Sequence, residues 1–207
     1  MQQIAIVIPL LGIAYAIGCV STGYYLVRIR TGTDIRQEGS GNVGARNVSR
    51  VLGQKTAALT LVGDALKGAI PVGLAMYLGL DSWAVMAVVM AVVAGHIWPA
   101  QLGFRGGKGL ATAMGAVLLI NPILVAFALA VSILGKLALR NVTAGGLAGV
   151  ALVPVAALIL RADVYEIAGL AVLASVLLFA HRDNLRSLAD GFRRDKVGES
   201  DRVGVTR

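Results

Sequence analysis

The sequence predicts an all-α polytopic membrane protein with seven transmembrane helices, an N-terminus outside and a C-terminus in the cytoplasm. Its 207 residues are 57% hydrophobic and 14% charged, with a mean hydropathy of +0.78. Soluble globular proteins carry about 25% charged residues, so this chain has too few to coat a soluble surface. Long apolar runs alternate with short polar segments, and the basic residues gather in some of those segments, as on the cytoplasmic side of membrane proteins.

The first three predicted membrane helices are Ile4–Val27, Val51–Leu80 and Trp83–Trp98. Each is long enough, at about 1.5 Å per residue, to cross most or all of a hydrocarbon core about 30 Å thick. No charge precedes the first run, and Arg28 and Arg30 follow it, so the positive-inside rule places the N-terminus outside. Gly68 and Pro71 predict a local irregularity in the second helix.

The region from Leu110 to Gly135 is long enough for one tilted helix, but Asn121-Pro122 interrupts it. Two short helices, Leu110–Ile120 and Pro122–Gly135, are favoured. With the runs Thr143–Leu160 and Val164–Ala180, they return the basic tail to the cytoplasm. A single crossing would leave that tail outside.

The chain is expected to form one membrane domain over residues 1–207. Its membrane core covers 1–191, and a loosely ordered polar tail covers 192–207. The N-terminus lacks the basic region of a cleavable signal, and the sole cysteine, Cys19, cannot form an internal disulfide. Nucleic acid is not an expected partner, because no aromatic–basic interleaving accompanies the charge.

Three polar segments fall on the predicted cytoplasmic side: the first is Gly39–Arg50, the second Gly103–Thr112 and the third His181–Arg186. Glycine lets backbone amides approach an anion closely, and Ser, Asn, Lys and Arg supply further donors. We therefore expect the segments to converge on a phosphorylated ligand. The candidate residues are Ser40, Gly41, Asn42, Arg46, Asn47, Arg50, Arg105, Gly106 and Gly107 through their amides, Lys108, His181, Arg182 and Asn184.

Three further residues lie within the predicted helices. Asp64 and Lys67 share one helix face, and either pair structurally or support the site. His96 is expected to orient the loop that follows it. Arg140 and Thr143 fit a positive cytoplasmic flank better than a fourth edge of the site. No metal is expected, because the two histidines are far apart and lack suitably spaced co-ligands.

Several common motifs are excluded. Residues 39–44 match GxGxxG, but an apolar helix precedes them instead of the strand that a dinucleotide-binding fold requires. The second polar segment lacks the spacing of a phosphate-binding P-loop. Neither histidine is followed by the Asp of a His-x4-Asp acyltransferase, since Gln101 and Arg186 occupy those positions.

The polar segments together resemble a known family. Gly-Ser-Gly-Asn-Val-Gly-Ala-x-Asn-Val-x-Arg at 39–50, Gly-His-x-x-Pro at 95–99 with Phe-Arg-Gly-Gly-Lys-Gly-Leu-Ala-Thr at 104–112, and His-Arg-x-Asn-Leu at 181–185 are similar to motifs of the bacterial acyl-phosphate:glycerol-3-phosphate acyltransferases. Asp64-Ala-Leu-Lys67-Gly68 also fits. The resemblance runs from Ser21 to about Gly191. It implies seven spans in the bacterial inner membrane and a site at the cytoplasmic face.

The resemblance also implies an activity: an acyl chain passes from acyl phosphate to the 1-hydroxyl of glycerol 3-phosphate, releasing inorganic phosphate, without cofactor or metal. Ser40, Asn42, Lys108, His181 and Asn184 would line the reacting centre, and Arg50 would hold a phosphate. Either His181 or a substrate phosphate would take the proton. The protein is expected to be a monomer whose partners are the two substrates and membrane lipids.

Two departures from the family pattern stand out. Arg46 replaces a usual Thr, either as an additional phosphate ligand or by displacing a useful hydroxyl. Ser187 and the pair Phe192-Arg193 also differ from the usual residues, which affects contacts beyond Asn184. The alternative function is a transporter or binding protein for a phosphorylated metabolite. It is less favoured because no internal repeat is evident and the polar segments lie on one side.

Overall fold

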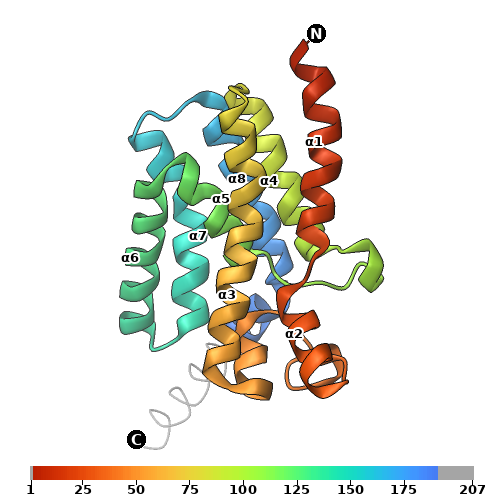
Figure 1. Ribbon diagram of the computed structural model, residues 1–207. Helices are drawn as coiled ribbons and strands as arrows, with labels where there is room; N and C mark the ends of the chain where they lie inside the picture. The colour runs from red at the N-terminus through yellow and green to blue at the C-terminus, as the bar shows by residue number, and fades with distance from the viewer. Residues whose placement is uncertain (1, 191–207) are drawn as a thin grey trace, which may run out of the picture.

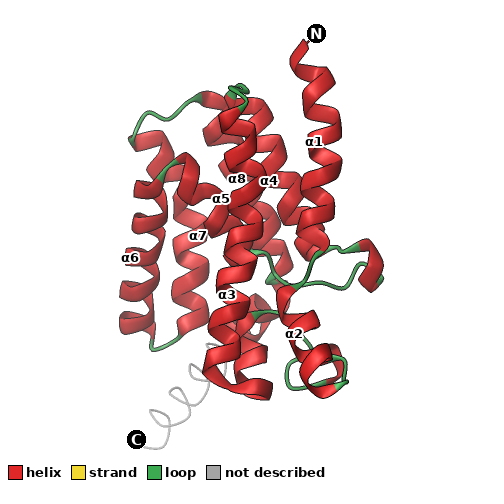
Figure 2. Cartoon of the chain, viewed as in Figure 1, coloured by secondary structure: helices red, strands yellow, loops and turns green. Residues whose placement is uncertain are grey.

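The computed structural model describes residues 2–190 and is helical, without strands in that range (Figures 1 and 2). The predicted all-helical class is confirmed. The predicted tail at 192–207, including Phe192 and Arg193, lies outside the described residues. The helix bounds are α1 Gln2–Cys19, α2 Thr22–Thr31, α3 Ala45–Tyr77, α4 Ser82–Ile97, α5 Leu110–Ile120, α6 Pro122–Leu139, α7 Val142–Ile159 and α8 Val164–Ala180, with short 3-10 turns η1 Ile35–Gln37 and η2 Ala100–Leu102.

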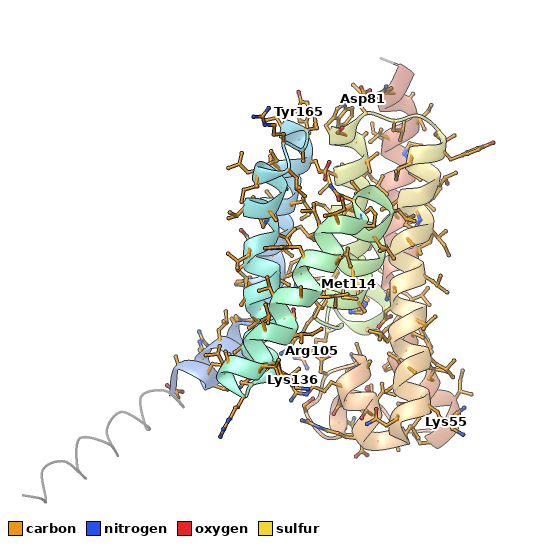
Figure 3. The ribbon with its side chains drawn as sticks, turned by 90° about the vertical axis from the view of Figure 1, so that its left-hand side faces the viewer. Lys55, Asp81, Arg105, Met114, Lys136 and Tyr165 are labelled. Carbon is orange, nitrogen blue, oxygen red and sulfur yellow. The ribbon has the colours of Figure 1, made fainter. Side chains whose placement is uncertain are left out.

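The long helices run side by side along one direction (Figure 1). Asp81 and Tyr165 lie at one end of the bundle, and Lys55 and Lys136 at the other (Figure 3). α4 is the central helix: α1, α3 and α8 pack against it, and Val88 and Val92 are fully buried. Within the described residues, five helical segments are long and apolar enough to cross a membrane, or six if α8 and the bent helix 182–190 count as one span. The protein is therefore an integral membrane bundle.

The helix bounds test the sequence prediction element by element. Two helices on either side of Asn121 are confirmed, with Pro122 opening α6 and the Asn121 side chain accepting a hydrogen bond from the Leu124 amide. The predicted first span, Ile4–Val27, lies within one candidate membrane span, Gln3–Thr31, but its helix is interrupted, because α1 ends at Cys19 and α2 starts at Thr22. The irregularity predicted at Gly68 and Pro71 is wrong: within α3 the backbone leaves helical geometry at Gly53, where φ is 80°.

Glycines bring three helix pairs into close backbone contact. Gly95 of α4 lies against the Tyr15 carbonyl of α1, and Gly115 of α5 against the Ala65 carbonyl of α3. Gly135 of α6 lies against Gly145 of α7. A Cβ at any of these positions would overlap the neighbouring backbone. Apolar helices in a bilayer gain little from the hydrophobic effect between them, so close packing of this kind holds the bundle together.

The interruption between α1 and α2 is stabilised by a buried polar cluster. The Lys67 ammonium donates to the Val20 carbonyl at 2.7 Å and pairs with the Asp64 carboxylate at 3.1 Å. The Thr22 hydroxyl donates to the same carboxylate at 2.9 Å. A carbonyl released by a broken helix is costly inside an apolar bundle unless it is hydrogen-bonded. Asp64 and Lys67 thus support the break that lets the chain turn toward the first polar segment.

Removing the Lys67 ammonium should destabilise the fold. Lys67→Met leaves the Asp64 carboxylate buried without its cation and Val20 without its donor, so we expect the free energy of unfolding to fall by about 3 to 5 kcal/mol. Denaturant titration of the purified protein in detergent measures the change. Lys55→Met, at an exposed position of the same helix, serves as the control and should have little effect. Equal stability of Lys67→Met and Lys55→Met would contradict this role.

Candidate active site

The first polar segment is shaped from within by Asn47. Its side chain is 2% exposed; the Oδ1 atom accepts from the Ser40 amide at 2.8 Å, and Nδ2 donates to the Glu38 carbonyl at 2.9 Å. Gly39 packs directly on this amide and has φ of 57°, a conformation that favours glycine. The predicted ligand residue Asn47 therefore braces the loop, while Ser40 and Gly41 are left exposed.

Helix α3 begins inside the first polar segment. The Asn42 side chain accepts from the Gly44 amide at 2.8 Å, and α3 starts at Ala45. Arg46 and Arg50 are consequently helical residues with exposed side chains. Arg46 donates to the Thr143 hydroxyl at 2.9 Å, which ties the first turn of α3 to the first turn of α7. Thr143 thus contacts a predicted site residue, although the sequence favoured a position in the positive cytoplasmic flank over a fourth edge of the site.

The second polar segment is attached to two helix ends. The Tyr15 hydroxyl donates to the Trp98 carbonyl at 2.7 Å, and the Gln101 side chain donates to the Cys19 carbonyl where α1 ends. The amides of Gly106 and Gly107 donate to the carbonyls of Ile97 and His96, each at 3.1 Å. The segment therefore folds back onto the end of α4.

These bonds bear on the predicted role of the two glycine amides. Both amides already satisfy carbonyls of α4, so binding a phosphate would require breaking hydrogen bonds that close the helix end. A Cβ at Gly106 would overlap the His96 carbonyl, and one at Gly107 would overlap the His96 ring. Close packing on α4 accounts for both glycines. The exposed Arg105 lies below the middle of the bundle, toward the Lys136 end (Figure 3).

His96 separates the second polar segment from the buried cluster at the α1–α2 break. It is 3% exposed, and its Nδ1 atom lies 3.8 Å from the Asp64 carboxylate. Its carbonyl and its ring both contact Gly107. The expectation that His96 orients the following loop fits this position. His96 thus packs against the loop that carries Lys108, and Asp64, the partner of Lys67, lies next to His96.

The third polar segment meets the second through a direct hydrogen bond. Lys108 donates from its ammonium to the Asn184 side-chain oxygen. His181 follows α8 directly and is 8% exposed, and its Nδ1 atom lies 2.7 Å from the Leu177 carbonyl. In the neutral ring Nδ1 then carries the hydrogen, which leaves Nε2 as an acceptor. Arg182 instead turns back onto α8, with its guanidinium 4.8 Å from the Phe179 ring.

Charges at this junction favour an anionic ligand. Burial lowers the pKa of Lys108, and the nearby cations Arg182 and Arg46 lower it further, while Asp183 partly opposes them. Burial also lowers the pKa of His181; the hydrogen bond to Leu177 opposes this, and Lys108 adds to the lowering. A phosphate bound beside Lys108 would relieve the repulsion among these cations.

An apolar cavity of about 330 Å³ lies next to the junction, between α5, α6, α7 and α8. Leu110, Met114, Val150 and Leu177 are among the side chains that line it. Leu110 follows Lys108 closely in sequence, and Leu177 accepts the His181 hydrogen bond, so the cavity reaches the polar junction. Its volume falls within the range of small-molecule sites, about 300 to 1,000 Å³.

The structure thus brings together some of the predicted site residues: Lys108, Asn184, His181, Arg182 and Arg46. Hydrogen bonds join Lys108 to Asn184 and Arg46 to α7, and His181 is near enough to Lys108 to feel its charge. Asn47, Gly106 and Gly107 are instead engaged in local structure. Sequence reasoning missed Arg36, which contacts Leu102 beside the second polar segment. The pattern Asp34-x-Arg36 just before the glycine-rich stretch was the available signal.

Comparison with known proteins identifies the family. A model of the glycerol-3-phosphate acyltransferase family matches residues 8–191. The chain belongs to this family. Glycerol-3-phosphate acyltransferase 1 of Desulfitobacterium hafniense is 46% identical over 84% of this chain and 87% of its own length. The glycerol-3-phosphate acyltransferase of Clostridioides difficile is 40% identical over 90% and 93%. The resemblance drawn from the polar motifs is confirmed.

Solved structures of another family member share the fold. PlsY (YgiH), an integral membrane glycerol 3-phosphate acyltransferase in its glycerol 3-phosphate form, superposes with a TM-score of 0.84 at 33% identity, covering 89% of this chain and 92% of that one. The lysophosphatidic acid form gives 0.82 at 32% identity, with the same coverage. The prediction that this chain is an enzyme with acyltransferase activity is therefore confirmed.

The lowered pKa of His181 predicts the pH dependence of turnover. A ring whose pKa lies below the free value of about 6.5 is neutral at pH 7 and gains its proton only at lower pH. We expect kcat/KM to stay level from pH 8 to about 6.5 and to fall below it, as Nε2 becomes protonated. Since phosphate substrates also titrate near 6, His181→Gln provides the control: any acid limb that it retains belongs to the substrate, and the part that it loses belongs to His181. An acid limb centred above about 7 would contradict the assignment.

Proposed function

We propose that the protein transfers an acyl chain from acyl phosphate to the 1-hydroxyl of glycerol 3-phosphate. The products are 1-acyl-glycerol 3-phosphate (lysophosphatidic acid) and inorganic phosphate, in phospholipid synthesis. Family membership supports the acylation of glycerol 3-phosphate. The choice of acyl phosphate as donor rests on one observation: the Lys108–Asn184–His181 junction, rich in cations, adjoins an apolar cavity. The phosphate of an acyl phosphate is an anion that suits the cationic junction, and its acyl chain suits the apolar cavity.

The reaction needs little covalent assistance from the protein. The glycerol oxygen attacks the acyl carbonyl carbon, and the bond from that carbon to the phosphate oxygen breaks. Phosphate then leaves with its electron pair. An acyl phosphate is already activated, so positioning and charge neutralisation supply most of the rate enhancement. The hydroxyl proton passes to His181 Nε2 or to a substrate phosphate.

Each polar residue has a distinct role in this proposal. Lys108 neutralises phosphate charge, and Asn184, whose oxygen accepts from Lys108, keeps its amide hydrogens available for the substrate. Ser40, Gly41 and Asn42 face the substrates from the first polar segment. Arg46, Arg50, Arg105 and Arg182 add positive charge around the mouth of the site. The cavity between α5 and α8 takes the acyl chain.

The proposed topology has seven crossings, with the N-terminus outside and the C-terminus in the cytoplasm. In this arrangement α1 and α2 form one crossing and α5 makes a short one. The chain direction in Figure 1 supports it, since α1 and α8 both run from the end marked by Asp81 toward the end marked by Lys55 (Figure 3). Basic residues at that second end fit a cytoplasmic face. The protein would act as a monomer in the bacterial inner membrane.

The transporter alternative is less well supported. The family comprises named acyltransferases, and Arg105 of the second polar segment lies below the middle of the bundle, on the side toward Lys136 (Figure 3). Transporter sites usually lie at the bilayer midplane between repeats. A passive binding protein would also have no need of a neutral imidazole beside the cation.

Phosphate release tests the proposed donor. Purified protein in lipid should release inorganic phosphate from acyl phosphate only when glycerol 3-phosphate is present, with equimolar 1-acyl-glycerol 3-phosphate. Malachite-green phosphate assay and mass spectrometry of the lipid measure the two products. Acylation from acyl coenzyme A or acyl carrier protein, with no reaction from acyl phosphate, would overturn the donor. Binding of glycerol 3-phosphate without any turnover would favour the transporter.

Lys108 should be indispensable to turnover but not to folding. Lys108→Ala removes the ammonium that neutralises phosphate charge, so we expect kcat to fall at least about 100-fold. The thermal midpoint should change little, because Lys108 is only partly buried. The exposed Lys55→Ala is the matched control and should keep wild-type activity. A folded Lys108→Ala enzyme with normal kcat would remove Lys108 from the site.

A further inference from the structure

Arg36 connects the residues that precede the first polar segment to those that precede the second. Its Nη1 atom donates to the Leu102 carbonyl at 2.7 Å, and Leu102 is the last residue of η2. Among the described residues 2–190, this is the hydrogen bond that directly joins 31–50 to 98–109. The contact lies where η2 extends on the α2 side of the bundle (Figure 1).

Two neighbours hold the Arg36 guanidinium in one orientation. Its Nε and Nη2 atoms donate to the two carboxylate oxygens of Asp34, at 3.0 and 2.7 Å. Its Cζ atom lies 5.3 Å from the centre of the Tyr24 ring, within the range of a cation–π interaction. A lysine, with its single ammonium group, cannot reproduce this paired contact of two guanidinium nitrogens with two carboxylate oxygens. The group therefore points at Leu102 before any substrate arrives.

The backbone of Arg36 contacts the loop that holds Ser40. Gly41 lies against the Arg36 carbonyl: a Cβ at Gly41 would be 3.2 Å from that oxygen, and φ there is 71°. Asp34 caps η1 by accepting from the Arg36 amide at 2.9 Å. One residue thus contacts Gly41 through its backbone and Leu102 through its side chain.

The charge of Arg36 is already balanced. The hydrogen bonds from Arg36 lower the pKa of Asp34, so this carboxylate stays ionised at neutral pH and the ion pair persists. A substrate phosphate would have to compete with the Asp34 carboxylate for the guanidinium. Arg36 is therefore poorly suited to binding a substrate directly, in contrast to the exposed Arg50 and Arg105.

We propose that Arg36 is a positioning residue for the acyltransferase reaction, setting the Ser40–Asn42 loop in register with Lys108. The Leu102 carbonyl leads into the backbone that ends at Lys108, and the Arg36 carbonyl abuts the backbone of Gly41. Losing the bridge leaves each loop folded on its own supports, Asn47 for one and the end of α4 for the other. What the loss of the bridge changes is the position of the two loops relative to each other. This inference rests on the function proposed above.

Kinetics of Arg36→Ala test the inference, with Arg30→Ala as the matched control. Arg30 is an exposed arginine of the same region, and its hydrogen bond goes to Thr56 of α3, outside both loops. A misplacement of about 1 Å costs on the order of 100-fold in turnover, so we expect a loss of that size in Arg36→Ala with a nearly unchanged thermal midpoint. Arg36→Lys should recover little, and Arg30→Ala should stay near wild type.

Chemical rescue separates positioning from general destabilisation. Added ethylguanidinium should restore part of the turnover of Arg36→Ala, while sodium chloride at equal concentration should not. Full activity of folded Arg36→Ala would overturn the inference, and so would a loss of activity that ethylguanidinium does not restore. If Arg36→Ala does not fold, full activity of Arg36→Lys overturns it, and reduced activity of a stably folded Arg36→Lys supports it.

Calorimetric binding of glycerol 3-phosphate, which needs no acyl donor, distinguishes this inference from the proposed function. If the wild-type protein binds glycerol 3-phosphate but does not use acyl phosphate, only the proposed identity of the acyl donor is contradicted. Weaker binding of glycerol 3-phosphate by Arg36→Ala than by Arg30→Ala would still support the inference in that case. Equal binding by the two variants would overturn it.

Discussion

Backbone groups released where helices end or break inside an apolar bundle must be given hydrogen-bond partners, and the site depends on how this is done. Water is scarce there, so each unpaired carbonyl is costly. The Lys67 side chain donates to the Val20 carbonyl at the α1–α2 break, and the Gln101 side chain donates to the Cys19 carbonyl at the end of α1. The amides of Gly106 and Gly107 close α4. The second polar segment is consequently anchored to the end of α4 through its own backbone.

This requirement divides the polar residues into two groups. Asn47, Gly106, Gly107 and the Asp64–Lys67 pair stabilise the loops and the helix ends. Lys108, His181 and Asn184 lie at the junction beside the apolar cavity, and Ser40 is exposed on the first polar segment. The glycine density that suggested phosphate nests is explained in large part by close packing on His96 and Asn47. In the proposed function, the second group contacts the phosphorylated substrates.

The arrangement suits a reaction between two anions. Burial lowers the pKa of Lys108, and the nearby Arg182 and Arg46 lower it further; an incoming phosphate would be attracted to this local excess of positive charge. Burial lowers the pKa of His181, with a further contribution from Lys108, and its Nδ1 is engaged by Leu177. Arg36, balanced by Asp34, links the loops without adding to that charge. Charge and alignment are thus supplied by different arginines.

The sequence by itself determined the helical membrane class, the division at Asn121-Pro122, the bounds of α5 and α8 to the residue, and the family. These follow from local hydropathy, from proline chemistry and from motifs that lie within single segments. The tertiary structure alone decided that the first apolar run breaks after Cys19, that α3 is distorted at Gly53, that Arg46 reaches Thr143 and that Arg36 reaches Leu102. Hydropathy cannot reveal which distant donor will satisfy a given carbonyl, because that choice is made only when separate helices pack together.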